Sequence, residues 1–537
     1  MRKWLLALSG AVLLAVSLVC ILFLEKQGPD IRVISQDRAQ KIEEKLVRQS
    51  EPMEFDLKFA GEALAYDSAG KTFFLPVSME TETWEQGSFE ATNGVEILFA
   101  EDFTREDKVS LLSQNRAIAF YAVSESGYEK CYLKLTGLPV LAFWGTEQVT
   151  ENGEILFEMS LYETEHSDDW VTTALTTSTL RGNTSLNYEK KSLRLKLKEQ
   201  KDDGSYKKSN KNLLGIRDDD DWILNSLYAD NSRIRDKLAM ELWQETGANK
   251  NPYGKNFGVT GEYVEVIING GYAGLYLLTH PIDRKQVGTD SVSAQITAGE
   301  DVIERIYKKK YSAAWLEEYF TGPLPDANQQ DYRGGFYLKG DAVLGNEEEW
   351  EPLRQMAACM EAGDETFAAE IGTLADVSNI LDNWLFFQAI AGFDNENKNV
   401  YYVSRQRDTE AYGYFIPWDM NISFGALYAE NEYYCMETMK ELESIVQFQP
   451  GTRLVELDVD ASRALVKETW SDWRKEAFDT ERVCRRMDQL MNRLVMSGAM
   501  EREMERWPAG NADTDITFMK DFTAKRLDFL DAYVEGL

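Results

Sequence analysis

The sequence predicts an α+β fold in which strands dominate the first part of the chain and helices the last part. Between residues 53 and 145, short alternating apolar runs are separated by turns rich in Gly, Asn and Asp, a pattern typical of a small β-domain. Over residues 263–278, two apolar runs flank Asn269-Gly270, a pair that suits a tight hairpin turn with positive φ. From Ala461 to the end the pattern is helical throughout.

The length of the chain predicts more than one domain, because 537 residues exceed what one ordinary core holds. In order, we expect a membrane anchor over residues 1–28, a charged stalk over 29–52, the β-rich domain over 53–145 and a larger α+β domain over 146–537. A hydrophobic content of 44% supplies enough apolar material for packed interiors and excludes a disordered chain.

The N-terminal segment is predicted to be a transmembrane helix. Arg2 and Lys3 precede an unbroken apolar run over residues 4–24, which is long enough to cross a bilayer. A cleaved signal peptide would have a shorter apolar core and a small-residue cleavage site, and the residues before Cys20 fit lipid attachment poorly. We therefore expect an uncleaved anchor, with the positive end in the cytoplasm and the rest of the chain outside it.

The charge and composition exclude several classes of function. With 91 acidic against 58 basic residues and a net charge of −33, nucleic acid and anionic membrane surfaces are poor partners. Five scattered cysteines indicate neither a disulfide framework nor a zinc site. Only two histidines, His166 and His280, leave little room for histidine-based catalysis. Any chemistry must therefore use carboxylates, amides, lysine and arginine.

Two polar loops carry the strongest candidate residues. GFDNENKNVYY, residues 392–402, places Asp394 and Asn399 at an Asp-x4-Asn spacing after a helix predicted to begin at Asp376. In protein kinases this spacing lets the Asp accept a hydroxyl proton while the Asn holds Mg²⁺, although both residues also serve as ordinary turn formers. FIPWDMNISFG, residues 415–425, sets Asp419 at the end of an apolar strand, where a kinase-like site has its metal-binding Asp.

A third element is the segment RGNTSLNYEKKSLRLKL, residues 181–197. Its small residues from Gly182 onward would let the backbone approach phosphate groups, and Lys191 or Lys196 on the following strand would neutralise them. The same pattern also fits an ordinary loop followed by an edge strand.

Taken in order, five blocks resemble those of the CotH family of spore-coat-type atypical protein kinases. The blocks are RGNTSLNYEKKSLRLKL, DDWILNSLYADNSRIRDKLAMELWQE, YVEVIINGGYAGLYLLT, DNENKNVYYV and IPWDMNISFG, and the resemblance extends over residues 140–537. It implies an atypical protein-kinase-like catalytic domain in a secreted or membrane-associated protein. Such a protein would use ATP and Mg²⁺, or Mn²⁺, to phosphorylate Ser or Thr of a partner surface or coat protein.

The resemblance also implies roles for individual residues. Asp394 would accept or orient the substrate hydroxyl, and Asn399 and Asp419 would bind the metal ion, with Asn421 offering a further oxygen. Lys191 would meet the nucleotide phosphates.

Three positions depart from the family pattern. Asn421 stands where a second Asp is usual and brings no charge to the metal, while His280 and Lys339 replace expected Glu residues. The alternative is therefore a pseudokinase, a surface assembly protein that binds partners without phosphoryl transfer. A glycan-binding protein is a third hypothesis, based only on the acidity, the aromatic residues and the β-domain.

Two charged features have structural interpretations. Arg235 matches a basic helix position of the family, where we expect a salt bridge. The run from Asp218 to Asp221 lacks the spacing and glycine of a calcium loop, so we expect a solvated loop ahead of a strand.

Overall fold

The computed structural model describes residues 28–49, 53–77, 81–150, 153–163, 170–251, 254–321, 333–339, 349–408, 410–428 and 435–537. Within these ranges, no helix combines the length and apolar character needed to cross a membrane. The apolar run of the predicted anchor, residues 4–24, lies outside the described residues.

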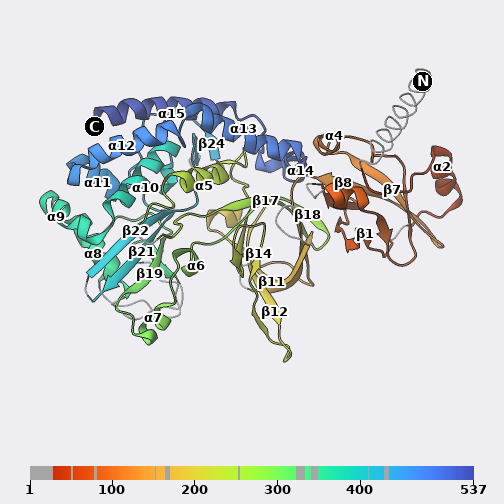
Figure 1. Ribbon diagram of the computed structural model, residues 1–537, viewed down its shortest axis with the longest axis horizontal. Coiled ribbons are helices and arrows are strands. Elements are labelled where there is room, and N and C mark those ends of the chain that lie inside the picture. The colour runs from red at the N-terminus through yellow and green to blue at the C-terminus, as the bar shows by residue number, and fades with distance from the viewer. Residues whose placement is uncertain are drawn as a thin grey trace, which may run out of the picture.

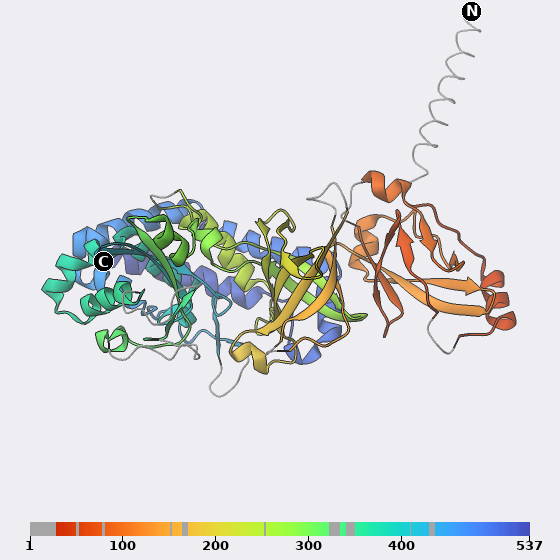
Figure 2. The ribbon, with the colours of Figure 1, turned by 90° about the horizontal axis from the view of Figure 1, so that it is seen from below.

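A β-rich part forms one end of the elongated molecule, and the C-terminus lies at the other end (Figures 1 and 2). Its main sheet has the order β3-β4-β8-β7-β6, and β2-β1-β5 form a small second sheet. Aromatic side chains such as Phe59, Trp84 and Phe120 fill the core of this part. The strands are β1 (Leu57–Phe59), β2 (Glu62–Ala63), β3 (Ala65–Asp67), β4 (Thr72–Pro76), β5 (Phe89–Ala91), β6 (Glu96–Phe99), β7 (Ala117–Ser124) and β8 (Gly127–Thr136), with short helices α3 (Thr81–Gln86) and α4 (Lys108–Ser113).

Residues 29–49, within the predicted stalk, pack along this β-rich part. They contain helix α2 (Gln36–Lys45), and Val33 forms a bridge with Phe99 of β6. Ile34 and Ile42 are buried, and the burial of these apolar side chains stabilises the segment against the sheet.

The middle of the chain forms an eight-stranded sheet with the order β11-β10-β9-β17-β18-β16-β12-β13. Because β11 pairs with both β10 and β12, the sheet closes on itself. The predicted hairpin is confirmed as β17–β18, with Asn269 and Gly270 at φ 49° and 70° in the turn. The strands are β9 (Val140–Trp144), β10 (Ile155–Tyr162), β11 (Val171–Arg181), β12 (Ser192–Gln200), β13 (Tyr206–Lys208), β16 (Asp221–Asn225), β17 (Gly261–Ile268) and β18 (Gly271–Thr279).

A four-stranded antiparallel sheet, β20-β19-β21-β22, follows, and helices cover one side of it (Figure 1). Its strands are β19 (Ile303–Lys309), β20 (Phe336–Lys339), β21 (Val400–Arg407) and β22 (Glu410–Pro417). The helices of this half are α5 (Arg235–Thr246), α6 (Arg284–Val287), α7 (Val292–Ala298), α8 (Glu351–Glu361), α9 (Asp364–Leu374), α10 (Val377–Ile390), α11 (Gln449–Leu457), α12 (Ser462–Lys475), α13 (Thr480–Met496), α14 (Ala499–Arg506) and α15 (Thr517–Gly536). Sheets and helices in separate layers confirm the α+β prediction.

Helix α10 positions the first candidate loop. Asp376 caps it by accepting a hydrogen bond from the backbone N–H of Asn379, as expected of its first residue. Residues 379–390 are buried all round, because α5, α11, α12, α15 and β22 all contact the helix. The helix ends at Ala391, whose φ of 53° turns the chain toward Asp394.

Candidate active site

The two candidate loops meet where β21 begins and β22 ends. The one-turn helix η4 (Phe393–Asn395) carries Asp394, and Trp418 and Asp419 directly follow β22. The backbone N–H of Trp418 donates to the carbonyl of Asn399 at 3.0 Å. The buried amide of Asn395 donates to the carbonyls of Asn399 and Trp418, at 3.1 and 2.9 Å. Asn395 therefore fastens one loop to the other, a role that sequence reasoning did not identify.

Asp394 lies in an environment that makes it a stronger base than an ordinary aspartate. Its side chain is 15% exposed, its Oδ1 pairs with Lys398 Nζ at 2.8 Å, and its Oδ2 accepts from Asn399 Nδ2 at 2.7 Å. The pKa of Asp394 is raised to about 6: burial is the largest cause, Lys398 opposes it, and the negative charge of Asp419 adds to it. The carboxylate is still mostly ionised at neutral pH.

Asp419 is exposed and adopts a left-handed backbone conformation, with φ 57°. The next backbone N–H, that of Met420, donates to Asp236 Oδ1 of α5 at 3.2 Å, and Asp236 Oδ2 accepts from Asn225 Nδ2 at 2.9 Å. Burial and the adjacent charge of Asp419 raise the pKa of Asp236 to about 7. Sequence reasoning missed Asp236, because an acid in the first turn of a helix is explained by the helix dipole alone.

The donor atoms at this site fit a hard divalent cation. The negative charge of Asp419 raises the pKa of both Asp394 and Asp236, and a bound cation would relieve this repulsion. In the part of the chain that the structure describes, no three His, Cys, Asp or Glu side chains are grouped to hold a metal. The amide oxygen of Asn399, or of the half-buried Asn421, would therefore have to complete an oxygen-only ligand set.

The predicted phosphate-binding lysines make contacts elsewhere. Lys191 Nζ donates to the carbonyl of Leu186 at 2.6 Å, within the turn η1 (Thr184–Asn187), and Lys196 Nζ pairs with Glu154 at 2.6 Å. Across the described ranges, no hydrogen bond or ion pair joins either lysine to Asp394, Asn399 or Asp419.

Gly182 has a backbone conformation that explains its residue type. Its φ is 130°, and a Cβ there would lie 1.8 Å from Ser185 Oγ, so only glycine fits the turn without rearrangement. Its backbone role toward phosphate stays a prediction.

Two other basic side chains lie next to Trp418, the residue that precedes Asp419. The guanidinium carbon of Arg181 is 6.0 Å from the centroid of the Trp418 ring, and Lys308 Nζ is 5.3 Å from it. Arg181 ends β11 and Lys308 belongs to β19, so the two sheets meet at this indole. In the sequence, Lys308 is one of three consecutive lysines, which is the usual pattern of a solvated segment.

Arg235 forms the expected salt bridge. It is buried, pairs with Asp230 and Glu437 at 2.6 Å each, and donates through Nε to the carbonyl of Ser423 at 3.1 Å. It thereby ties α5 to the segment that follows Asp419.

The two departures at expected Glu positions have structural roles here. His280 is buried and accepts from the backbone N–H of Thr260 at 3.4 Å, and burial lowers the pKa of His280 to about 4, so it is neutral. Lys339 donates to the carbonyl of Ile282 at 2.6 Å, and burial lowers the pKa of Lys339 to about 8.

The Asp218–Asp221 run is not a solvated loop, and that prediction was wrong. Asp219 is fully buried and pairs with Arg217 and Lys285, while Asp220 is buried and pairs with Lys285 at 2.9 Å. The basic partners come from neighbouring segments and compensate the burial of these carboxylates. The run therefore stabilises the fold in β15 (Asp218–Asp219), which pairs with β14 (Lys211–Asn212), and at the start of β16.

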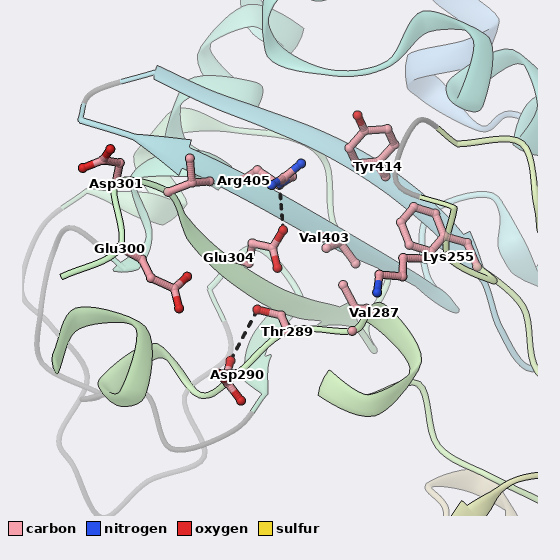
Figure 3. Close-up of a pocket in the computed structure, with 13 residues that line it drawn as sticks. Lys255, Val287, Thr289, Asp290, Glu300, Asp301, Glu304, Val403, Arg405 and Tyr414 are labelled. Carbon is pink, nitrogen blue, oxygen red and sulfur yellow. Dashed lines mark hydrogen bonds and ion pairs between the residues drawn. The ribbon is translucent and has the colours of Figure 1, made fainter. Parts of the chain in front are cut away.

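A cavity of about 500 Å³ lies further along the sheet face that carries Lys308 (Figure 3). Lys308 of β19 lies opposite Tyr401 of β21. Glu304 lies opposite Arg405 on the same face of the sheet, further along the two strands. Glu304 and Arg405 form an ion pair at 2.7 Å on the cavity wall. The other lining residues include Lys255, Val287, Thr289, Asp290, Glu300, Asp301, Val403 and Tyr414.

The family model described as CotH kinase protein matches residues 179–530, a range that contains both candidate loops and the β11–β12 turn. No curated protein matches the chain. The match spans more than half of the sequence, and the chain therefore belongs to the CotH kinase protein family.

Proposed function

We propose that the protein is an extracytoplasmic CotH-like kinase that transfers the γ-phosphate of ATP to Ser or Thr hydroxyls of partner surface or spore-coat-type proteins. The observation that carries this proposal is the contact between Asn399 and Asp394, beside Asp419, in a member of this family. An N-terminal membrane helix would hold the enzyme at the cell surface.

Asp394 takes the substrate proton in this proposal. The hydroxyl oxygen forms a bond to the γ-phosphorus, the bond from that phosphorus to the bridging oxygen breaks, ADP leaves, and the proton passes to the Asp394 carboxylate. The raised pKa of about 6 favours this transfer while leaving the base largely ionised near pH 7.

Mg²⁺ or Mn²⁺ would supply positive charge against the phosphates. Asp419 and the amide oxygens of Asn399 and Asn421 would hold it. Asn399 donates to Asp394 through Nδ2, so its amide oxygen is not used in that contact and would bind the ion.

A pseudokinase that assembles surface proteins is the second candidate. The uncharged Asn421 and the neutral His280 favour it, because each removes a negative charge that the family commonly provides. In that case partner binding would be independent of Asp394.

The test is phosphate transfer by the detergent-solubilised full chain, with γ-labelled ATP, Mg²⁺ or Mn²⁺ and a basic acceptor protein. We expect label from the wild type and from the exposed control Asp521→Asn, and a loss of at least about a thousandfold in Asp394→Asn and Asp419→Asn. Nucleotide binding without transfer, autophosphorylation or ATP hydrolysis would favour the pseudokinase. Absence of nucleotide binding would reject the kinase proposal.

A further inference from the structure

Two basic side chains converge on the tryptophan that precedes Asp419. Arg181 comes from the end of β11 in the closed sheet, and Lys308 comes from β19 in the four-stranded sheet. Both are half-buried, and both contact the face of the Trp418 ring within about 6 Å of its centroid. Asp419 directly follows Trp418, and its negative charge raises the pKa of Lys308, so Lys308 lies within electrostatic reach of the proposed metal ligand.

Neither cation has a carboxylate partner in the described part of the chain, unlike the neighbouring Arg194, which pairs with Asp221 through Nε at 2.8 Å. The pKa of Lys308 is lowered to about 7, chiefly by burial and in addition by the positive charges of Arg181, Lys339 and Lys310. The negative charge of Asp419 acts in the opposite direction. Positive charge is thus gathered here without the ion pairs that compensate buried charges elsewhere.

An anion with several charges would compensate this cluster. We propose that Arg181 and Lys308 bind the polyphosphate of the nucleotide, in place of Lys191 and Lys196. The planar guanidinium suits two phosphate oxygens at once, and the ammonium of Lys308 provides a second, compact charge from the opposite sheet. The identification of the anion as the triphosphate of ATP rests on the proposed function.

The position of Gly182 supports the same anion. It directly follows Arg181, is exposed, and has the φ of 130° that turns the chain into η1. The phosphates would therefore lie between this turn and Asp419, with Trp418 as a fixed apolar floor that is 5% exposed. The sheet that carries β11 and the sheet that carries β19 would each contribute one cation, so binding would hold the two sheets together.

The test is calorimetric titration of the full chain with Mg²⁺·ATP and, separately, with inorganic triphosphate. We expect Lys308→Met and Arg181→Met each to weaken both affinities by about 10- to 100-fold, with Lys308→Arg retaining most of the binding. The matched control is Lys250→Met, because Lys250 Nζ also lies 5.3 Å from an indole centroid, that of Trp473, outside the site. Thermal unfolding of each variant checks that it folds.

The outcomes separate this inference from the kinase proposal. Unchanged affinities in Lys308→Met and Arg181→Met would overturn the inference alone, as would a loss confined to Lys191→Met or Lys196→Met. Weakened triphosphate binding in the two variants would support the inference even if the wild type transferred no phosphate. A wild type that binds neither ATP nor triphosphate would overturn both proposals.

Discussion

The buried charges around α14 are paired with buried opposite charges, whereas those at the candidate active site are paired less completely. Glu503 of α14 accepts from Lys190 at 2.8 Å, from Arg233 at 3.2 Å and from the backbone N–H of Leu275 at 2.9 Å. Next to it, Arg502 forms two hydrogen bonds of 2.7 Å to Glu265. Burial alone would raise the pKa of Glu265, but Arg502 and two hydroxyl donors hold it below its usual value.

At the candidate active site, burial and neighbouring like charges outweigh the compensating partners. The pKa values of Asp394 and Asp236 are raised by burial and by Asp419, and that of Lys308 is lowered by burial and by neighbouring cations. Among the described residues, the acids of the α14 network thus have buried cationic partners, whereas at the candidate active site Asp394 has one half-buried partner, Lys398, and Asp236 has hydrogen-bond donors alone. Charges of both signs that are only partly compensated are consistent with the proposal that a charged ligand binds here.

The largest expected effect on stability comes from breaking the ion pairs of Glu503 in the α14 network. Glu503→Ala leaves Lys190 and Arg233 buried without a carboxylate, so we expect the free energy of unfolding to fall by about 3–5 kcal/mol. Urea denaturation measures this change. Glu501→Ala, on an exposed position of the same helix, is the control, and an equal effect of the two variants would remove the contrast between the regions.

Neutralising an active-site carboxylate should have a smaller effect that depends on pH. The folded-state pKa of Asp394, about 6, lies above its ordinary value of 3.8, so the wild type loses stability as pH rises from about 4 to about 6. Relative to wild type, Asp394→Asn should therefore gain roughly 1–3 kcal/mol between pH 4 and pH 8.

Denaturation of both proteins at several pH values measures this difference. The exposed Asp521→Asn serves as the control, because Asp521 lies on α15, where its half-exposed side chain pairs with Lys525 of the same helix. Mg²⁺ should stabilise the wild type more at pH 8 than at pH 5. A difference between Asp394→Asn and wild type that stays constant with pH would contradict the proposed repulsion.

Breaking the link between the loops should cost less than breaking the α14 network. Asn395→Ala removes two hydrogen bonds and leaves the carbonyls of Asn399 and Trp418 without this donor, an expected loss of about 1–3 kcal/mol. Thermal unfolding measures the loss, with Asn397→Ala in the same loop as the control. Because Asn395 holds the two loops together, phosphate transfer should fall as well, and a fall in stability with full activity would separate the loops from the chemistry.

The sequence predicted well those features that depend on local pattern. The Asn269-Gly270 hairpin follows from turn chemistry, α10 from its cap and apolar residues, and the two polar loops from their position after a helix and a strand. The structure brings Asp394, Asn399 and Asp419 together at the joint where Val400 pairs with Pro417.

The remainder depends on pairings between segments far apart in the chain. Lys308 is half-buried because β19 lies between β20 and β21, and nothing in the local run of lysines indicates this. Arg181 and Lys308 meet only because two sheets adjoin at Trp418. Asp219 is buried for the same reason, since its partner Lys285 is 66 residues away. Periodicity and spacing carry no information on such contacts.

The smallest expected effect is the influence of the Asp419 charge on the pKa values of its neighbours. Asp419→Asn removes the negative charge that raises the pKa of Asp394 and Asp236, so both pKa values should fall, by less than about one unit because burial is the larger cause. Carboxyl carbon chemical shifts followed against pH give these values directly. The pKa of Lys308 should fall as well, because Asp419 is the charge that raises it. If the pKa values of Asp394 and Asp236 stayed unchanged in Asp419→Asn, burial alone would set them. The chemical type of the ligands would then be the one remaining support for a cation between Asp419 and its neighbours.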